Sequence, residues 1–374
     1  MKRIALIENT GKDFFKARMR LAKYLKNNGF EITVIVPNDG YLTKIEEANF
    51  RVLSVGKIIR GKGISNQIKF AYDLYKILKK NQFDVIHCFR MQPNIIGGFI
   101  AGLLGHKNVI NHITGLGIVF TYNSTKFKIQ QFIVKLLYQF NNKVFKTKYI
   151  FQNHQDPKDL NIKSHFKVIK GSSINESKFY PKQIDFLEKF TKSNHTKYLL
   201  FASRLLKSKG LAEAVSAVDI LNKKTNNSVK LLISGSIDND NFDSFSEDEI
   251  SNLSKIKNIF FLGNKDDMHN LINFVDICIL PSYYREGTPR FLLESMACGK
   301  PIITTNNPGC DQLVQDHITG AVCEKKNIVS LELAITNVIN SNYTQMGKKG
   351  RQYYISDFSE DVVFDEITNF YFKN

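Results

Sequence analysis

The chain has 374 residues, of which 43% are hydrophobic and 23% charged, a composition typical of a folded globular protein large enough for two domains. The formal net charge is +17, and residues 1–185 hold the whole excess, with 31 Lys and Arg against 12 Asp and Glu. No apolar run has the length of a membrane-spanning helix, and the five cysteines show neither disulfide nor metal-site spacing. The basic half predicts an anionic partner surface, either nucleic acid or a membrane leaflet.

Strand and helix patterns alternate along the first half. The apolar stretch at 4–7 predicts a first strand rather than a signal peptide, because it is brief and ends at Glu8. Strands that alternate with helices are typical of a parallel sheet covered on both faces. The further segments expected in this half are helices at 14–27, 67–80 and 95–104, and strands at 31–36, 84–88, 109–113, 149–152 and 167–170.

The pattern restarts after a polar, lysine-rich stretch. We therefore predict an α/β fold of two Rossmann-like domains, at 1–182 and 198–356, joined by a linker at 183–197. A final helical segment at 357–374 ends the chain. In doubly wound sheets, ligands bind outside the carboxyl ends of the strands.

The most informative segment follows a buried strand predicted at 277–280. A turn at 287–289 and a helix at 290–297 come next, and this geometry presents backbone N–H groups and the helix dipole to an anion. Two carboxylates, Glu286 and Glu294, flank the anion site. This arrangement suits a ligand with phosphates in the middle, a sugar at one end and a ribose at the other. The alternative is a packing turn with two ordinary surface glutamates.

A second charged element follows the strand predicted at 198–202. Arg204 and Lys209 lie in the loop before a helix that begins near Leu211. Two fixed cations at this position can stabilise negative charge on a bound ligand without a metal ion. The alternative is a solvated basic turn that caps the following helix.

Together these segments resemble the Glu-x7-Glu and Arg-x4-Lys-Gly elements of the retaining nucleotide-sugar glycosyltransferases of family four. The resemblance covers nearly the whole chain and implies the GT-B fold, with two domains facing a cleft and a C-terminal helix that crosses back to the first domain. It implies a UDP-sugar donor, no metal or other cofactor, and a catalytic group of Glu286, Lys209 and Arg204. The residues that it places at the nucleotide-sugar are Glu294, Gly287, Thr288, Pro289, Arg290, Phe291, Gly263 and Asn264.

The same resemblance places the acceptor at the first domain. Gly11 and Lys12 follow the first strand, where family members carry a glycine turn, although this chain has one glycine rather than two. Arg18 is the next candidate along the chain, with an exposed surface position as its alternative. Arg90 follows another strand and is a candidate contact for an acceptor phosphate.

A histidine position of the family is changed in this chain. Many members carry a histidine directly before the glycine at 115, in contact with the transferred sugar, whereas this chain has Thr114 there. His112 lies two residues earlier, on the same face of a strand. His112 is therefore either a substitute for the family histidine or a core residue.

An amphipathic helix is expected within residues 101–150, a stretch that holds seven lysines and no acidic residue. Its apolar residues recur at helical spacing from 129 to 144. One interpretation is a core helix with a lysine face toward water, and the other is docking on anionic lipid, which the charge excess favours. The residues expected at the membrane are Lys126, Lys128, Lys135, Phe132 and Leu136.

Three short segments, 34–41, 115–117 and 170–175, are similar to a subgroup that builds undecaprenyl-diphosphate-linked glycans in bacterial protein N-glycosylation. This implies transfer of N-acetylgalactosamine or another N-acetylhexosamine by a peripheral, monotopic enzyme at the cytoplasmic face of the inner membrane. The alternatives are a lipopolysaccharide or capsule glycosyltransferase with another donor, and a nucleotide-sugar 2-epimerase of the same fold. A nucleic-acid-binding protein is disfavoured, because the sequence has no recognised binding motif and no Trp. No motif fixes the donor sugar, the attacked hydroxyl or the oligomeric state.

Overall fold

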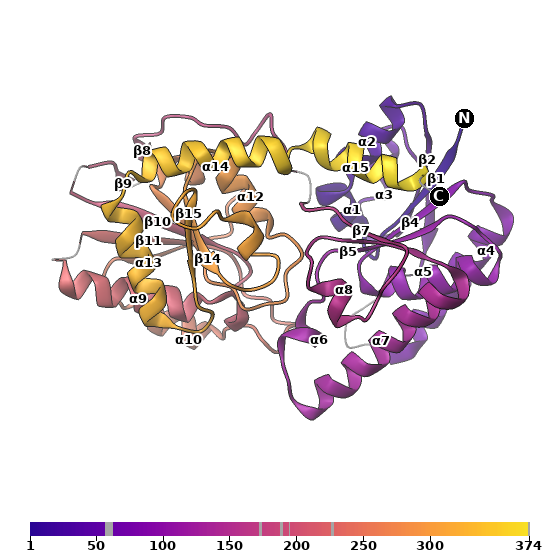
Figure 1. The fold of residues 1–374 in the computed structure, drawn as a ribbon, viewed down its shortest axis with the longest axis horizontal. Coiled ribbons are helices and arrows are strands. Elements are labelled where there is room, and N and C mark those ends of the chain that lie inside the picture. Colours follow the sequence, from indigo (N-terminus) through magenta and orange to yellow (C-terminus); the bar gives the residue numbers. More distant parts are fainter. Residues whose placement is uncertain (57–62, 172–173, 188–189, 194, 226–227, 373–374) are drawn as a thin grey trace. The chain divides into compact units, whose positions relative to one another are not determined.

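The structure is a computed structural model that describes residues 1–56, 63–171, 174–187, 190–193, 195–225 and 228–372. The chain divides into two compact units, which we call the N-terminal unit (residues 1–173 and 360–374) and the C-terminal unit (residues 174–359) (Figure 1). Parts of three predicted features lie outside the described residues, namely residues 172–173 of the subgroup segment, residues 188–189 and 194 of the linker, and residues 373–374 of the final helical segment.

A seven-stranded parallel sheet forms the N-terminal unit, in the order β3-β2-β1-β4-β5-β6-β7. Strand order reverses between β1 and β4, and this is the topological switch point at which such sheets bind ligands. The strands are β1 (Arg3–Ile7), β2 (Glu31–Pro37), β3 (Arg51–Val55), β4 (Val85–Phe89), β5 (Val109–Ile113), β6 (Lys148–Phe151) and β7 (Phe166–Val168).

Helices cover both faces of this sheet, because alternate residues of β1 pack into two separate cores. Ile4 and Leu6 pack with one set of helices, including α2 and α15, whereas Ala5 and Ile7 pack with α4 and α5. No helix among the described residues is both long and apolar enough to cross a bilayer. The helices are α1 (Gly11–Ala17), α2 (Met19–Asn27), α3 (Leu42–Glu46), α4 (Gly63–Lys80), α5 (Met91–Leu103), α6 (Ile118–Thr121), α7 (Thr125–Phe145), α8 (Asp156–Asp159) and α15 (Glu360–Phe372).

The C-terminal unit repeats the architecture with six parallel strands in the order β12-β11-β10-β13-β14-β15. Its switch point lies between β10 and β13. The strands are β10 (Lys197–Ala202), β11 (Val229–Ser234), β12 (Ile259–Gly263), β13 (Ile277–Leu280), β14 (Ile302–Thr305) and β15 (Gly320–Cys323). The helices are α9 (Leu211–Lys224), α10 (Glu247–Ser254), α11 (Met268–Phe274), α12 (Arg290–Ala297), α13 (Ile328–Asn340) and α14 (Tyr343–Asp357), with short 3-10 turns η1 (Lys207–Lys209) and η2 (Asp311–Leu313).

Both sheets have the order expected of doubly wound nucleotide-binding domains, so the predicted fold class is confirmed. The final helix belongs to the N-terminal unit, as Figure 1 shows for the yellow α15. Ile367 and Tyr371 are buried in its core, and the Tyr371 hydroxyl lies 2.7 Å from His87 Nδ1. Glu360 pairs with Arg20 of α2.

The predicted domain boundary and linker are wrong. Ile174 and Phe179 are buried in the core of the C-terminal unit, so that unit begins before residue 182. The predicted linker contains a two-stranded hairpin, β8 (Phe186–Leu187) and β9 (Phe190–Thr191). The Phe190 ring packs edge-on against Phe260 at a centroid distance of 5.1 Å. The polar composition predicted a solvated connection, whereas Phe190 is buried in the core of the C-terminal unit and Ile184 and Leu187 pack against that core.

The helix predicted at 14–27 is two helices. The chain leaves helical geometry at Arg18, whose φ is −118°, and α2 starts at the next residue. Arg18 is 7% exposed, and its guanidinium lies over the Phe89 ring at 4.5 Å. The break turns this side chain into the unit instead of toward water.

Candidate active site

The loop after β13 carries Glu286, and the loop after β10 carries Lys209. The two side chains form an ion pair in which Lys209 is 11% and Glu286 12% exposed. The Lys209 ammonium also lies 4.8 Å from the centre of the Tyr284 ring. Ser282 donates a hydrogen bond of 3.3 Å to Glu286 Oε1. A predicted carboxylate and a predicted cation thus meet at the switch point of the C-terminal sheet.

Backbone contacts hold these two loops together. The carbonyl of Ser208 accepts hydrogen bonds from the N–H groups of Tyr283 at 2.8 Å and Tyr284 at 3.0 Å. Gly210 has φ +80°, and a Cβ there would lie 2.2 Å from the carbonyl oxygen of Pro281. A side chain at this position would therefore separate the Lys209 loop from the Glu286 loop.

Glu294 lies in a cavity of about 210 Å³ at the carboxyl ends of β10, β11 and β12. Burial raises the pKa of its carboxyl group, and the nearby Arg290 partly offsets this rise. Arg290 Nε lies 2.9 Å from Glu294 Oε1, so the predicted phosphate contact Arg290 is paired within its own helix. The cavity is lined by Ala202, Ser203, Arg204, Ser234, Gly235, Ser236, Asn264, Lys265, Met268, Phe291 and Glu294.

Four predicted donor residues thus share one cavity, although they come from two different loops and one helix: Arg204, Asn264, Phe291 and Glu294. Arg204 pairs with Asp238 at 2.7 Å and is 42% exposed. The Gly263 carbonyl accepts hydrogen bonds from the Gly235 N–H at 3.0 Å and the Ser234 hydroxyl at 3.1 Å. The carboxyl ends of neighbouring strands are therefore tied together at this cavity.

The turn at 287–289 is supported by the loop after β14. Gln312 Nε2 donates to Thr288 Oγ1 at 3.3 Å. Gly309 has φ +88°, and a Cβ there would lie 2.1 Å from the carbonyl oxygen of Gly287. Pro289 precedes α12 in extended geometry. These contacts fix the backbone between the two glutamates.

Sequence reasoning missed several residues of this region. Ser282 contacts Glu286, Gly309 packs on the turn, and Ser234, Ser236 and Lys265 line the Glu294 cavity. A signal was present for the cavity residues, because they directly follow strands whose carboxyl ends meet at one edge of the sheet. None was present for Gly309, because its role depends on a close approach between two loops.

The predicted acceptor residues lie at the carboxyl edge of the N-terminal sheet. Gly11 begins α1, and the Lys12 N–H donates to Asp39 Oδ2 at 3.1 Å. Thr114 is half-buried just after β5. His112 is only 2% exposed, and burial, followed by the nearby Arg18, lowers its pKa well below the ordinary value. The ring is therefore neutral and buried, at 3.4 Å from Gln152 Nε2.

Arg18 and Arg90 both pair with Glu8, a residue that sequence reasoning used only to mark the end of a strand. Arg18 Nε lies 3.4 Å and Arg90 Nε 3.2 Å from the Glu8 carboxylate, which is completely buried. Arg90 has φ +69° and ψ 167°, a region almost confined to glycine that costs about 1–3 kcal/mol. Arg90 Nη2 also lies 3.2 Å from Asp13 Oδ2.

Helix α7 directs its apolar face to solvent. Its buried residues are few, namely Val134, Tyr138, Asn141 and Asn142. The predicted apolar face is therefore not packed in the core of the unit, although Val134 and Tyr138 of α7 are. Phe99 and Leu103 of α5 are also exposed, and the Phe99 ring lies 6.1 Å from Phe140. The exposed apolar residues of α7, which are 42% to 62% exposed, are Ile129, Phe132, Ile133, Leu136, Leu137, Phe140 and Val144.

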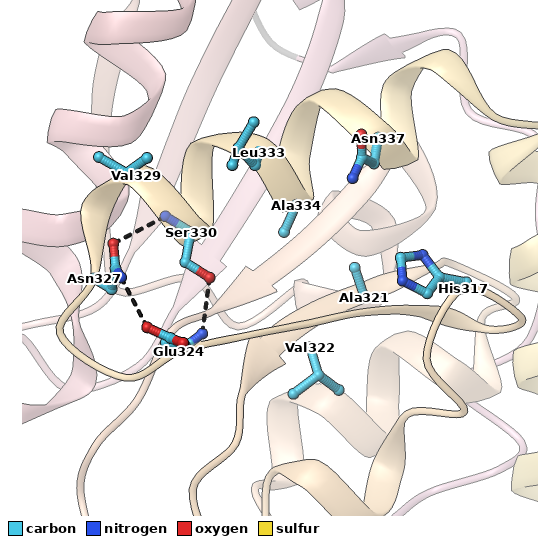
Figure 2. Close-up of a pocket in the computed structure, with 10 residues that line it drawn as sticks. All are labelled: His317, Ala321, Val322, Glu324, Asn327, Val329, Ser330, Leu333, Ala334 and Asn337. Atoms are coloured by element: carbon cyan, nitrogen blue, oxygen red, sulfur yellow. Dashed lines mark hydrogen bonds between the residues drawn. The ribbon is translucent and has the colours of Figure 1, made fainter.

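Another hollow of the C-terminal unit lies between β15 and α13 (Figure 2). Three of its polar residues lie at the start of α13: the Ser330 N–H donates to the N-cap Asn327 Oδ1 at 3.0 Å, and the Glu324 N–H donates to Ser330 Oγ at 3.0 Å. None of the predicted site residues lines it. We therefore place the candidate site at the carboxyl ends of β10 to β13.

Comparison with known proteins identifies two matching families. Residues 3–148 match the family Glycosyl transferase 4-like, and residues 183–353 match Glycosyl transferases group 1. The chain is 27% identical over 343 residues to the N,N'-diacetylbacillosaminyl-diphospho-undecaprenol alpha-1,3-N-acetylgalactosaminyltransferase of Campylobacter jejuni, which covers 89% of this chain and 88% of that protein. It is 27% identical over 360 residues to the UDP-Gal:alpha-D-GlcNAc-diphosphoundecaprenol alpha-1,3-galactosyltransferase of Escherichia coli, with 93% and 90% covered.

Solved structures with the same fold include the sucrose-phosphate synthase of Thermosynechococcus elongatus, with a TM-score of 0.80 at 18% identity over 99% of this chain and 98% of that chain. HepE of Anabaena in complex with UDP-glucose has a TM-score of 0.75 at 14% identity over 99% of both chains. At such identities the likeness shows the fold alone. The two family matches, the two doubly wound sheets and the Glu286 segment together show that the chain belongs to the family-four glycosyltransferases of the GT-B fold.

Proposed function

We propose that this glycosyltransferase is a retaining enzyme that moves N-acetylgalactosamine, or another N-acetylhexosamine, from UDP to an undecaprenyl-diphosphate-linked saccharide. The observation that carries the proposal is the pairing of Glu286 with Lys209 at the same sheet edge as the cavity that contains Glu294 and Arg204. The names of the Campylobacter jejuni and Escherichia coli relatives support a lipid-linked acceptor.

In the proposed reaction, Glu294 accepts hydrogen bonds from the ribose hydroxyls, and Arg204 and Lys209 face the diphosphate. The acceptor hydroxyl oxygen forms a bond to the anomeric carbon. The bond from that carbon to the β-phosphate oxygen breaks, and its electron pair stays with UDP. The hydroxyl proton passes to an oxygen of the departing phosphate. Attack on the face from which UDP leaves retains the anomeric configuration.

The positive charges of Lys209 and Arg204 would offset the negative charge that develops on the departing diphosphate. Lys209 is paired with Glu286, and an arriving diphosphate would offer this ammonium a more highly charged partner. Glu286 is then released toward the transferred sugar. Because two fixed cations offset the developing negative charge, we expect no metal ion and no further cofactor to be required.

The exposed apolar face of α7 favours docking on the anionic cytoplasmic leaflet of the inner membrane. A contiguous exposed apolar face marks an interaction site, and here lysines border it, with Lys126 and Lys128 exposed and Lys135 half-buried. Phe132 and Leu136 would enter the headgroup region while the lysines contact anionic lipids. Docking through this surface would bring the enzyme to the membrane that holds an undecaprenyl-linked acceptor. A lipid-docking surface also disfavours a 2-epimerase, which needs no lipid acceptor.

The test is UDP release from UDP-N-acetylgalactosamine with and without undecaprenyl-diphospho-bacillosamine. We expect release only with the lipid, and an α-linked product identified from the coupling of its anomeric proton. Release without the lipid, together with a changed sugar, would identify an epimerase. A β-linked product would rule out retention.

A second donor has specific support, because the Escherichia coli relative is named as a galactosyltransferase. UDP-galactose and UDP-N-acetylglucosamine therefore belong in the same experiment. If UDP-galactose were the only donor used, the proposed lipid-linked acceptor would stand and galactose would replace N-acetylgalactosamine as the transferred sugar.

A further inference from the structure

Four charged side chains form a cluster at the switch point of the N-terminal sheet, where β1 and β4 end. The centre of this cluster is Glu8, which is completely buried at the carboxyl end of β1. Its carboxylate is shared by Arg18 at 3.4 Å and Arg90 at 3.2 Å. Asp13 of α1 lies 3.2 Å from the other side of Arg90. We call these four residues the Glu8 cluster.

Folding alone does not explain this cluster. Burying a carboxylate and a guanidinium removes both from water, and such pairs rarely stabilise a protein more than apolar residues of similar volume. The backbone of Arg90 is also held in a conformation that few residues other than glycine adopt. Buried charge and backbone strain together, at the edge where doubly wound sheets bind ligands, are typical of a functional site.

The charges of the Glu8 cluster indicate what it binds. Its two carboxylates and two guanidinium groups lie against one another, so their formal charges sum to zero. A diphosphate would have to compete with Glu8 and Asp13 for Arg90. A sugar hydroxyl, in contrast, both donates and accepts hydrogen bonds, so it can bridge Asp13 and Arg90, whose side chains are 36% and 35% exposed.

We propose that Glu8 is a positioning residue that fixes Arg90, so that Arg90 and Asp13 together hold hydroxyl groups of the acceptor sugar rather than the acceptor diphosphate. This inference rests on the proposed function and deepens it, because it names the part of the acceptor that the cluster recognises. Arg18 is too buried to reach a ligand and acts through Glu8.

The experiment compares Glu8→Gln and Asp13→Asn with the wild-type enzyme at saturating UDP-sugar, using Lys16→Gln on the exposed side of α1 as the control. We expect the KM for the lipid-linked acceptor to rise about tenfold or more in both variants, which corresponds to about 1.4 kcal/mol. The Kd for UDP and the melting temperature of Asp13→Asn should stay at wild-type values. If Glu8 and Asp13 had a purely structural role, the variants would be less stable, and the acceptor KM and the Kd for UDP would rise by similar factors.

Undecaprenyl diphosphate without a sugar separates the two parts of the acceptor. As a competitive inhibitor it should keep the same Ki in the wild type and in Asp13→Asn, because it lacks the hydroxyls that the cluster holds. A Ki that rises together with the acceptor KM would assign the cluster to the diphosphate and overturn the inference. An unchanged acceptor KM in both variants would overturn it as well.

The wild-type measurement comes first and keeps the two proposals distinguishable. If the wild type transfers sugar and the variants behave like it, only the inference fails. If the wild type transfers no sugar to any lipid-linked acceptor, the proposed function fails and the inference falls with it. Should Glu8→Gln not fold, Asp13→Asn decides alone, because that side chain lies at the surface of the unit and not in its core.

Discussion

Lys209 and Glu286 stand 77 residues apart in the chain and form an ion pair at the switch point of the C-terminal sheet. They meet because β10 and β13, the strands that precede them, are neighbours in that sheet. The pair joins the two sequence elements on which the family resemblance rests. It also places the carboxylate and the cation at a single point, where a sugar diphosphate would replace the contact between them.

Replacing Glu286 with Gln should reduce transfer at least about 100-fold, because the variant loses the negative charge next to the transferred sugar. UDP binding should remain measurable, since Glu294 and Arg204 are unchanged. Rapid-mix kinetics measures the rate of transfer, and UDP titration measures the affinity for UDP. Glu247→Gln, on the exposed first turn of α10, is the matched control. Wild-type turnover in Glu286→Gln would remove Glu286 from the reaction.

Replacing Lys209 with Ala should weaken UDP binding about tenfold or more, because a charge-assisted contact to the diphosphate is worth about 1.5–3 kcal/mol. Arg204→Ala should have a smaller effect, since Arg204 is 42% exposed and pairs with Asp238. Isothermal titration with UDP and with uridine separates the contributions. Uridine lacks phosphate, so its affinity should not change in Lys209→Ala. An unchanged Kd for UDP would place Lys209 away from the diphosphate.

Replacing Gly309 with Ala should impair both folding and donor binding. The alanine would have to adopt φ +88° and its Cβ would lie 2.1 Å from the carbonyl oxygen of Gly287, and strain and overpacking together cost about 2–5 kcal/mol. Gly29 is the control, because it has φ +82° with no atom within 4 Å of a Cβ. Gly29→Ala should cost only about 1–2 kcal/mol. Chemical denaturation gives the free energy of unfolding of the two variants. An equal loss of stability in both would mean that the contact with Gly287 is unimportant.

The raised pKa of Glu294 predicts how stability depends on pH. The folded protein keeps this proton to a higher pH than the unfolded chain, whose glutamates titrate near 4.5. Between 4.5 and the raised pKa, stability should therefore fall as pH rises, by at most about 1.4 kcal/mol per pH unit. Glu294→Gln should lack this component. Denaturation of both proteins from pH 4 upward gives the difference, and a constant difference would show that the pKa of Glu294 is not raised.

Reversing the charges of Lys126, Lys128 and Lys135 to Glu should release the protein from anionic vesicles. Each basic residue near such a surface contributes about 1 kcal/mol, so the triple variant should bind roughly 100-fold more weakly. Phe132→Ser with Leu136→Ser should reduce binding even at high salt, because the apolar contribution is not screened. The control reverses three exposed lysines of the C-terminal unit, Lys255, Lys348 and Lys349. An equal loss of vesicle binding in that control would indicate that the net charge of the protein, and not the α7 surface, attracts it to the vesicles.

Sequence patterns predicted the secondary structure correctly where the residues of one short segment determine it. The buried strand predicted at 277–280 and the helix predicted at 290–297 are β13 and α12 with the same bounds. Apolar continuity marks a strand covered on both faces, and Gly299, with φ +71°, ends the helix. The linker was mispredicted because its composition is polar, whereas Phe190 is buried in the core and Ile184 and Leu187 pack against it.

By itself the sequence determined the two parallel α/β domains, the family and the residues of the Glu286 segment, because periodicity and turn chemistry act over a few residues. The tertiary structure decided which distant residues meet. Strand order brought Lys209 to Glu286 and Arg90 to Glu8. It also decided that the apolar face of α7 points to solvent, since helical spacing defines an apolar face without saying what covers it.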